Sequence, residues 1–143
     1  CSMIDLSTSC ALSNVSSILI GPTAQSDWNG QGNTNAIMGQ SGHAGGAAYL
    51  CDAYTNVNYG TGAYSDWYLP SRGELIDLWT NIKLVHKALD NDGNAATTGI
   101  KFSFYWSSSE YSSNGAWTFN FNGGTTNGSA KSTAYYVRAV RAF

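Results

Sequence analysis

Residues 67–89 read WYLPSRGELIDLWTNIKLVHKAL and contain the clearest local signal in the chain. Ser71 and Glu74 form a capping box, in which the serine side chain accepts from the backbone N–H of Glu74 and the glutamate reaches back to the serine N–H. Apolar residues then recur at helical spacing: Leu75, Leu78, Trp79, Ile82, Val85 and Leu89. The pattern predicts one helix from Ser71 to about Leu89, followed by a turn over residues 90–93.

The regions on either side of this helix predict strands, turns and one further helix. Residues 11–20 are enriched in β-branched side chains and predict a strand, and Asn29 and Gly30 predict a tight turn within a loop. A glycine cluster at 42–46 precedes a short predicted helix at 47–51. The last third of the chain has a pattern of strands and loops. Two helices followed by a strand-rich half predict a single α+β domain.

Residues 102–136, FSFYWSSSEYSSNGAWTFNFNGGTTNGSAKSTAYY, have an unusual composition. Most positions are Ser, Thr, Asn, Gly or Tyr, and only Glu110 and Lys131 carry charge. Small polar residues commonly leave a segment disordered because they bury little apolar surface, but Trp106 and Trp117 supply anchors here. Tyrosine offers rigid contact area and Ser, Gly and Asn offer adaptable hydrogen bonds, as in antibody paratopes. The composition predicts a recognition surface held on a scaffold.

The whole chain, at 143 residues, fits one domain that can bury a single core. Its charged fraction of 11% is well below average, and its formal net charge is −2. Because the sequence has no run of Lys or Arg, the charge pattern argues against a nucleic-acid partner. No apolar stretch is long enough to span a membrane. Low charge with abundant Ser, Thr and Asn is typical of a secreted, surface or virion protein.

The three cysteines, Cys1, Cys10 and Cys51, leave at least one thiol unpaired. A bridge from Cys51 to Cys10 or to Cys1, and three free thiols, are both compatible with the sequence. Cys51 falls in the short predicted helix without a neighbouring motif that would activate a thiol. A structural role is therefore favoured over a catalytic one.

Metal, nucleotide and hydrolase chemistry find little support in the sequence. His43 and His86 are far apart and accompany no Cys or Asp cluster, so zinc is not predicted. Residues 90–94, DNDGN, differ from a calcium loop because the glycine comes fourth and Lys101 stands where the bidentate Glu belongs. Residues 39–46 lack the lysine of a phosphate-binding loop, and the chain has no nucleophile elbow. The sequence predicts no catalytic residue, no metal site and no cofactor.

Three segments together resemble a known domain family. Residues 67–75 match the pattern W-x-L-P-S-x-x-E-L, residues 47–51 read AAYLC, and residues 105–111 read YWSSSEY ahead of Ala116 and Trp117. Their order and spacing are similar to a large bacterial and viral family with a C-type lectin fold of the formylglycine-generating-enzyme type. The resemblance implies a single C-type lectin-like domain over residues 1–143, with two helices, antiparallel sheets and long ordered loops.

The ending YVRAVRAF, residues 136–143, resembles the terminus of variable proteins diversified by diversity-generating retroelements. In such systems adenines of a template are copied with errors, often through AAY codons for Asn. Substitution at the two adenines reaches Ser, Thr, Tyr, Gly, Ala, Asp and Phe but not Trp, Glu, Lys, Gln or Met. In residues 102–136 the unreachable types are Trp106, Glu110, Trp117 and Lys131. The resemblance implies that this segment is the variable ligand-binding region and that 137–143 is a closing strand.

The resemblance also implies a division of roles among residues. The scaffold residues are Trp67, Glu74, Trp106, Glu110, Trp117, Arg138 and Arg141. The contact residues are Ser103, Tyr105, Ser112, Asn114, Thr118, Asn120, Asn122, Thr125, Thr126, Asn127, Ser129, Thr133 and Tyr135. Strand alternation places the even-numbered residues of 118–122 opposite Trp117, which belongs in the core. Because mutagenesis can also produce Phe, the sequence leaves open whether Phe119 and Phe121 are core or contact residues.

The implied function is binding of a receptor or other surface ligand through a diversified surface, without catalysis. The implied partner is a protein or other surface ligand rather than nucleic acid or a membrane interior. The implied location is a virion tail fibre or an extracellular or cell surface. A fixed-specificity adhesin or surface lipoprotein domain with the same fold is the alternative, and a degenerate cysteine-oxidising enzyme is a distant third.

Overall fold

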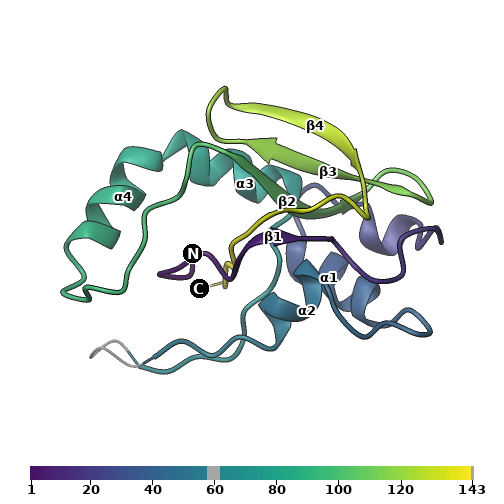
Figure 1. Cartoon of the computed structure of the whole chain (residues 1–143), viewed down its shortest axis with the longest axis horizontal. Helices are drawn as coiled ribbons and strands as arrows, with labels where there is room; N and C mark the ends of the chain where they lie inside the picture. The colour runs from purple at the N-terminus through teal and green to yellow at the C-terminus, as the bar shows by residue number, and fades with distance from the viewer. Residues whose placement is uncertain (58–61, 143) are drawn as a thin grey trace.

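The computed structural model of the chain describes residues 1–57 and 62–142. Within them one mixed sheet has the strand order β1-β5-β2-β3-β4, and helices pack around it (Figure 1). The strands are β1 (Ser7–Cys10), β2 (Phe104–Glu110), β3 (Gly115–Asn120), β4 (Thr125–Ala130) and β5 (Tyr135–Val137). The helices are η1 (Pro22–Ala24, 3₁₀), α1 (Gly30–Met38), α2 (Ala47–Asp52), α3 (Arg72–Thr80) and α4 (Ile82–Asp90). The α+β class is confirmed, with more helices than the two expected and a sheet that is mixed rather than purely antiparallel.

The central strand of the sheet is β2. It pairs antiparallel with β3 on one side and parallel with β5 on the other. β4 pairs with β3 and forms one edge, and β1 pairs with β5 and forms the other. Because the first and last strands are neighbours, the two ends of the chain lie side by side (Figure 1), and the Ser2 N–H donates to the Ala139 carbonyl at 2.7 Å.

The predicted capping box is confirmed at the start of α3. The Glu74 N–H donates to Ser71 Oγ at 3.4 Å, and the Ser71 N–H donates to the Glu74 carboxylate at 2.7 Å. The prediction of one helix to Leu89 is wrong, because α3 ends at Thr80 and α4 begins at Ile82, with Asn81 between them at φ −102° and ψ 16°. The Asn81 side chain donates to the Asp77 carbonyl at 2.9 Å, the kind of local bond by which Asn competes with helical continuation.

The prediction of a strand over residues 11–20 is also wrong. Regular pairing stops at Cys10, and the following backbone groups are bonded elsewhere. The Asn14 N–H donates to the Gly45 carbonyl at 3.1 Å, and the Ile20 N–H donates to the Glu110 carboxylate at 3.0 Å. The run therefore forms an irregular segment that is held by isolated backbone bonds and by the Glu110 side chain rather than by a strand ladder.

Asn29 and Gly30 do not make the expected turn within a loop. Asn29 is instead the N-cap of α1, and its side chain accepts from the Gly32 N–H at 2.9 Å. Asn is a favoured residue at both turns and N-caps, since in both places its side chain bonds to a nearby backbone N–H. Gly30 and Gly32 follow it, and because glycine has a low helix propensity the sequence does not predict a helix here.

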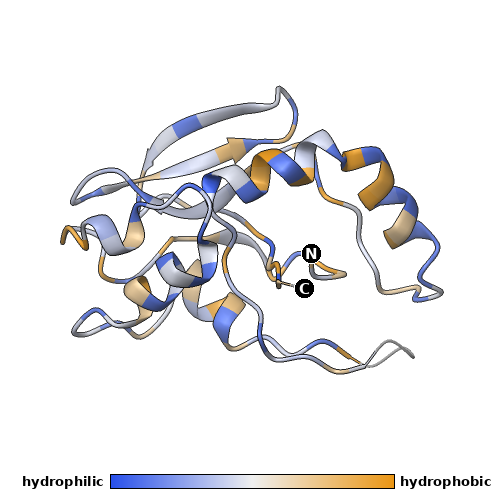
Figure 2. Cartoon of the chain, turned by 180° about the vertical axis from the view of Figure 1, so that it is seen from behind, coloured by the Kyte–Doolittle hydropathy of each residue, from blue (hydrophilic) through white to orange (hydrophobic). Residues whose placement is uncertain are grey.

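Two apolar clusters lie on opposite sides of β2. Tyr105 belongs to one cluster and Trp106 to the other, because successive strand residues point to opposite faces. The first cluster contains Leu12, Ala24, Ile37, Ala47, Ala48, Cys51, Trp67, Leu69, Trp106, Ala116, Val137 and Ala139. The second contains Leu75, Ile100, Tyr105, Phe119 and Phe121, with side chains of α3 and α4 packed against it. Figure 2 shows the hydrophobic positions of α3 and α4 alternating with hydrophilic ones.

The C-terminal segment is pinned to the rest of the fold by β5 and by one further bridge. Val137, Ala139 and Val140 are buried, and Val140 pairs antiparallel with Tyr68. The regular strand is therefore shorter than the expected 137–143 and begins earlier. Phe143, the last residue of that expected strand, lies outside the described residues.

Candidate ligand-binding surface

The β2–β3–β4 portion of the sheet positions most of the predicted contact residues. In β3 and β4 the Cα partners are Thr118 with Asn127 and Asn120 with Thr125. Partners directly opposite each other in an antiparallel pair share one face of the sheet. Phe104 of β2 faces Asn120 in the same way. One face of the sheet thus collects the even-numbered residues of β2 and β3 and the odd-numbered residues of β4.

The other face of β3 packs on α3. Phe119 lies 6.2 Å from Trp79 and 5.0 Å from Phe121, centroid to centroid, and both phenylalanines are 1% exposed. Tyr105 is equally buried and stacks edge-on against Phe121 at 5.1 Å. The alternatives left open for the two phenylalanines therefore resolve in favour of the core, and the prediction that Tyr105 contacts a ligand is wrong. β2 is covered on both faces because it is the central strand.

Trp117 lies on this same α3-facing side but at its margin. It is half-buried, with the Arg72 guanidinium 4.6 Å from its ring centroid and Tyr111 5.2 Å away. Arg72 also forms an ion pair with Asp27 at 2.5 Å. Trp117 is therefore a packed scaffold side chain, though less enclosed than the sequence implied.

The opposite face is the candidate site, and we call it the polar face. It consists of Phe104, Asn120, Thr125, Asn127, Ser129 and Tyr135. Thr125 and Asn127 are exposed, and the other four are half-buried. The rings of Phe104 and Tyr135 lie 5.6 Å apart, centroid to centroid, and Ser129 Oγ donates to the Tyr135 hydroxyl at 3.3 Å. The polar face therefore combines two adjacent aromatic rings with the amide and hydroxyl groups of its other four residues.

Thr118 lies beneath this face rather than on it. It is 1% exposed, and its hydroxyl donates to the Asn127 carbonyl at 3.1 Å and lies 3.3 Å from Ser129 Oγ. The prediction that Thr118 contacts a ligand is therefore wrong. Its neighbours on β4 cover it, and its hydroxyl helps to hold them in place.

Phe104 is the member of the polar face that sequence reasoning missed. The contact set expected from the sequence contains the neighbouring Ser103 and Tyr105 but not Phe104. In β2 every residue from Tyr105 to Glu110 is buried. Phe104, the first residue of the strand, is only half-buried. The signal that could have found Phe104 is its even spacing from Trp106, combined with its position at the end of the strand.

Five further predicted contact residues lie at the two ends of the strands: Ser103, Ser112, Asn114, Asn122 and Thr133. Ser112 and Asn114 form the β2–β3 loop, in which Ser112 Oγ donates to Asn114 Oδ1 at 3.1 Å. The Asn114 carbonyl accepts from the Lys131 N–H at 2.9 Å, which places this loop beside the one that carries Thr133. At the other end the Ser103 carbonyl accepts from the Phe121 N–H at 3.0 Å, next to the exposed Asn122.

Thr126 is the one remaining predicted contact residue. It is half-buried and is the Cα partner of Phe119, so it lies on the α3-facing side of β4. It therefore does not share a face with the neighbouring Thr125 and Asn127.

A buried ion pair joins the loops beneath the site. Glu110 and Lys131 are both almost fully enclosed, and Lys131 Nζ donates to the Glu110 carboxylate. The same carboxylate accepts from the Gly21 N–H at 2.8 Å, and Lys131 Nζ also donates to the carbonyls of Ile18 and Ser113 at 3.0 Å. Removing one partner would leave the other charge buried without compensation. These are the two charged residues of the segment 102–136.

The other predicted scaffold residues are held by specific bonds. Trp106 is fully buried and donates from its indole N–H to the Cys10 carbonyl at 2.8 Å. The Trp67 indole donates to the Tyr64 carbonyl at 2.9 Å. Arg141 forms two bonds to the Asp66 carboxylate at 2.8 and 2.9 Å. Glu74 caps α3, as described above.

Arg138 is buried at the edge of the second cluster and has Asp5 3.5 Å from its Nε. Burial lowers the pKa of Arg138, and the charge of Asp5 opposes this shift. Burial likewise raises the pKa of Asp5, and Arg138 opposes that shift. Tyr105 donates to the Asp5 carboxylate at 3.0 Å, so the residue predicted as a contact completes a buried polar network instead.

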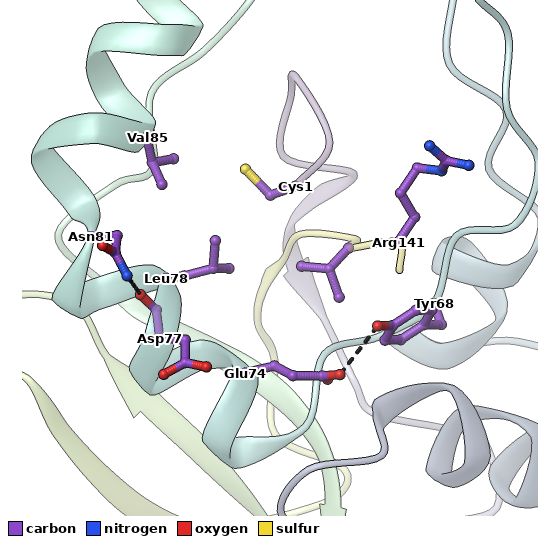
Figure 3. Close-up of a pocket in the computed structure, with 9 residues that line it drawn as sticks. Cys1, Tyr68, Glu74, Asp77, Leu78, Asn81, Val85 and Arg141 are labelled. Carbon is purple, nitrogen blue, oxygen red and sulfur yellow. Dashed lines mark hydrogen bonds between the residues drawn. The ribbon is translucent and has the colours of Figure 1, made fainter. Parts of the chain in front are cut away.

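The described part of the chain contains no group of three or more His, Cys, Asp or Glu residues placed to hold a metal ion. The same residues include no helix that is long and apolar enough to cross a membrane. A cavity of 390 Å³ lies between α3, α4 and the C-terminal segment, away from the polar face (Figure 3). Its wall includes Tyr68, whose hydroxyl donates to Glu74 at 3.1 Å, together with Leu78 and Val85.

The thiols of the first cluster are not activated. Burial raises the pKa of Cys10, and it raises the pKa of Cys51 still further. A reactive cysteine needs the opposite shift. The arrangement therefore gives no support to cysteine oxidation as the activity of this chain.

The fold and the polar face together define a C-type lectin-like binding domain. The chain belongs to the Lcl C-terminal domain family, which matches residues 10–141. This is a C-type lectin-like domain of the variable proteins of diversity-generating retroelements, and it is not a known enzyme family. No curated protein matches the chain. The resemblance on which the sequence interpretation rested is thus confirmed.

Proposed function

We propose that this domain binds a protein or other surface ligand through the polar face, and that retroelement mutagenesis sets the side chains on that face. The observation that carries the proposal is the separation of two kinds of residue. Small polar and aromatic side chains that adenine mutagenesis can produce cover one open face. The residues that it cannot produce, Trp106, Glu110, Trp117 and Lys131, lie buried or half-buried beneath or beside it.

Affinity would come mainly from the two aromatic residues. Phe104 and Tyr135 are half-buried, adjacent and supported from below by Trp106, which lies 5.2 Å from Tyr135. Aromatic residues packed in this way lose little side-chain freedom on binding and often dominate interface energies. The amides and hydroxyls of Asn120, Asn127 and Ser129 would form the polar rim.

The structure refines the proposed contact set. Tyr105 and Thr118 leave it because they are buried, and Phe104 joins it. The proposed set is Ser103, Phe104, Ser112, Asn114, Asn120, Asn122, Thr125, Thr126, Asn127, Ser129, Thr133 and Tyr135. Within it, the six residues of the polar face form the centre and the loop residues form the margin, whereas Thr126 lies on the α3-facing side of β4 and can reach a ligand only around the edge of the sheet.

The proposed location is a virion tail fibre or a cell surface, where a repertoire of binding specificities is useful. A fixed-specificity adhesin or surface lipoprotein domain would have the same fold. The two are distinguished by the surrounding genome. A retroelement system predicts a nearby reverse transcriptase gene and a near-repeat of the 3′ coding segment that differs only at adenines, whereas an adhesin predicts neither.

A display experiment tests the binding function directly. Codons for the six residues of the polar face are replaced by AAY-derived mixtures, and the library is selected against streptavidin as an arbitrary protein target. We expect folded binders to emerge. A matched library at exposed positions of α4, including Lys83, Leu84 and Lys87, should yield none. Equal yields from both libraries, or unfolding of most polar-face variants, would contradict the proposal.

A further inference from the structure

The three cysteines divide between the two sides of the sheet. Cys51 is fully buried in the first apolar cluster, and Cys10 packs against that same cluster. Cys1 instead packs against the second cluster and lines the cavity between α3, α4 and the C-terminal segment (Figure 3). All three are free thiols in the structure. Of the pairings that the sequence left open, only Cys10 with Cys51 joins two residues of one cluster.

The backbone next to Cys10 crosses the beginning of the helix that carries Cys51. The Ala47 N–H donates to the Ala11 carbonyl at 2.9 Å, and the Ala48 N–H donates to the Leu12 carbonyl at 3.4 Å. Cys10 precedes this crossing by one residue. Cys51 follows Ala47 by four residues, which is about one helical turn or 6 Å along the axis and on the same helix face. The two cysteines therefore flank the same hydrogen-bonded crossing.

Charge coupling supports this proximity. The pKa of Cys51 is raised first by burial and then by the neighbouring charge of an ionised Cys10. Charge repulsion of this kind grows as two groups approach each other, and it is screened less in buried surroundings than in water. Cys10 is the more accessible of the two, since it is only half-buried.

We propose that Cys10 and Cys51 form a disulfide when the protein meets a small-molecule disulfide oxidant such as oxidised glutathione. The Cys10 thiolate attacks one sulfur of the oxidant, breaks its S–S bond and releases one reduced thiol. Cys51 then attacks the sulfur of Cys10 and displaces the second oxidant thiol, which takes up the proton that the Cys51 thiol loses. Two protein thiols are oxidised to one bond, and one disulfide is reduced to two thiols. Disulfides of this kind are typical of the oxidising surroundings outside the cytosol.

The bond would tie β1 to α2 next to Tyr135 of the polar face. Cys10 is the Cα partner of Tyr135, and its carbonyl holds the indole of Trp106, which in turn packs against Tyr135. The closed loop runs from residue 10 to residue 51. A disulfide that closes a loop of this length typically raises the melting temperature of a domain of this size by about 5–15 °C.

Peptide mapping tests the pairing without any mutation. The protein is incubated with oxidised and reduced glutathione, quenched with acid, alkylated under denaturing conditions and cleaved before aspartate. Such cleavage separates the three cysteines into peptides 1–4, 5–26 and 27–51. We expect peptides 5–26 and 27–51 to be linked and Cys1 to be alkylated. Three alkylated thiols, a linkage to peptide 1–4, or glutathione left on Cys10 would overturn the proposal.

Thermal unfolding gives a second readout with a matched control. Cys1→Ser should keep the rise in melting temperature on oxidation, because it removes the thiol outside the first cluster. Cys10→Ser should abolish that rise while leaving the buried Cys51 in place. A rise that persists in Cys10→Ser, or that disappears in Cys1→Ser, would contradict the assigned pairing.

Discussion

The serines of β2 and the polar side chains of β4 are chemically alike, but the former are buried and the latter are exposed to solvent. Ser107, Ser108 and Ser109 are fully buried in the central strand, whereas Thr125 and Asn127 are exposed on the edge strand. In the sequence both groups belong to the same low-complexity segment. Their different surroundings follow from the sheet order, because β2 has neighbours on both edges and packed layers on both faces.

The buried serines have defined hydrogen-bond partners. Ser107 Oγ donates to the Trp117 carbonyl at 2.7 Å, and Ser109 Oγ donates to the Ser26 carbonyl at 2.8 Å while accepting from the Arg72 N–H at 3.0 Å. These bonds connect β2 to β3, to the segment before α1 and to the start of α3. In this chain, residue type alone does not show whether a small polar residue belongs to the scaffold or to the surface. Its position in the sheet and its hydrogen-bond partners do.

The largest expected effect comes from breaking the buried ion pair. Glu110→Ala should reduce the free energy of unfolding by about 3–5 kcal/mol, because Lys131 would remain buried without a counter-charge. Urea denaturation measures this directly. The control is Lys83→Ala on the exposed side of α4, which should stay within about 0.5 kcal/mol of the parent protein. A loss below about 1 kcal/mol for Glu110→Ala would show that the pair does not hold the loops together.

Next in size is a direct comparison of the two polar groups. Ser109→Ala should reduce the free energy of unfolding by about 1–3 kcal/mol, because it leaves the partly buried Arg72 N–H without its acceptor and removes one of the two donors to the Ser26 carbonyl, the other being the Asn33 amide. Asn127→Ala should change the same quantity by less than about 0.5 kcal/mol. Equal losses of stability in urea denaturation would contradict the claim that the polar residues of β2 stabilise the fold and those of β4 do not.

A smaller effect is expected on binding rather than stability. In a binder selected from the polar-face library that retains Tyr135, Tyr135→Ala should weaken binding by about tenfold or more, since central aromatic residues are common hot spots. Calorimetry or surface plasmon resonance gives the dissociation constant. The matched change Tyr49→Ala, on an exposed tyrosine of α2, should leave it unchanged. Equal losses in the two variants would place the binding surface elsewhere.

The smallest expected effect is that of salt. None of the six residues of the polar face is charged, so the dissociation constant of such a binder should change by less than about threefold between 0.05 and 0.5 M NaCl. Titration at several salt concentrations checks this. A steep salt dependence would mean that charged residues outside the polar face carry the binding.

Much of the fold could be predicted from local signals. The capping box of Ser71 and Glu74 and the short helix at 47–51 are encoded in adjacent residues, and both were predicted correctly. The break at Asn81 was missed because the apolar spacing continues across it. The irregular course of residues 11–20 was missed because Glu110, far away in sequence, supplies the partner of the Ile20 N–H.

The candidate site could be predicted as a region but not residue by residue. The exposed positions of β4 follow from composition and alternation. Tyr105 and Thr118 are predicted to be exposed but are buried, and Phe104 is absent from the predicted contact set, because burial on each face of a strand depends on the layers and strands around it. The even spacing of Phe104 from Trp106 indicates that the two share a face of β2, but no spacing rule indicates that Tyr105 and Thr118 are buried.

The most direct test of the account is a fold-retention scan over residues 102–136. Every position is replaced in turn by the residues that AAY codons reach, and variants are sorted by binding of a conformation-dependent antibody raised against the folded domain. We predict broad tolerance at Phe104, Asn120, Thr125, Asn127, Ser129 and Tyr135 and strong intolerance at Trp106, Ser107, Ser109, Glu110 and Lys131. Equal tolerance of the two sets, or unfolding on substitution of the polar face, would contradict the division between an interchangeable surface and a fixed scaffold.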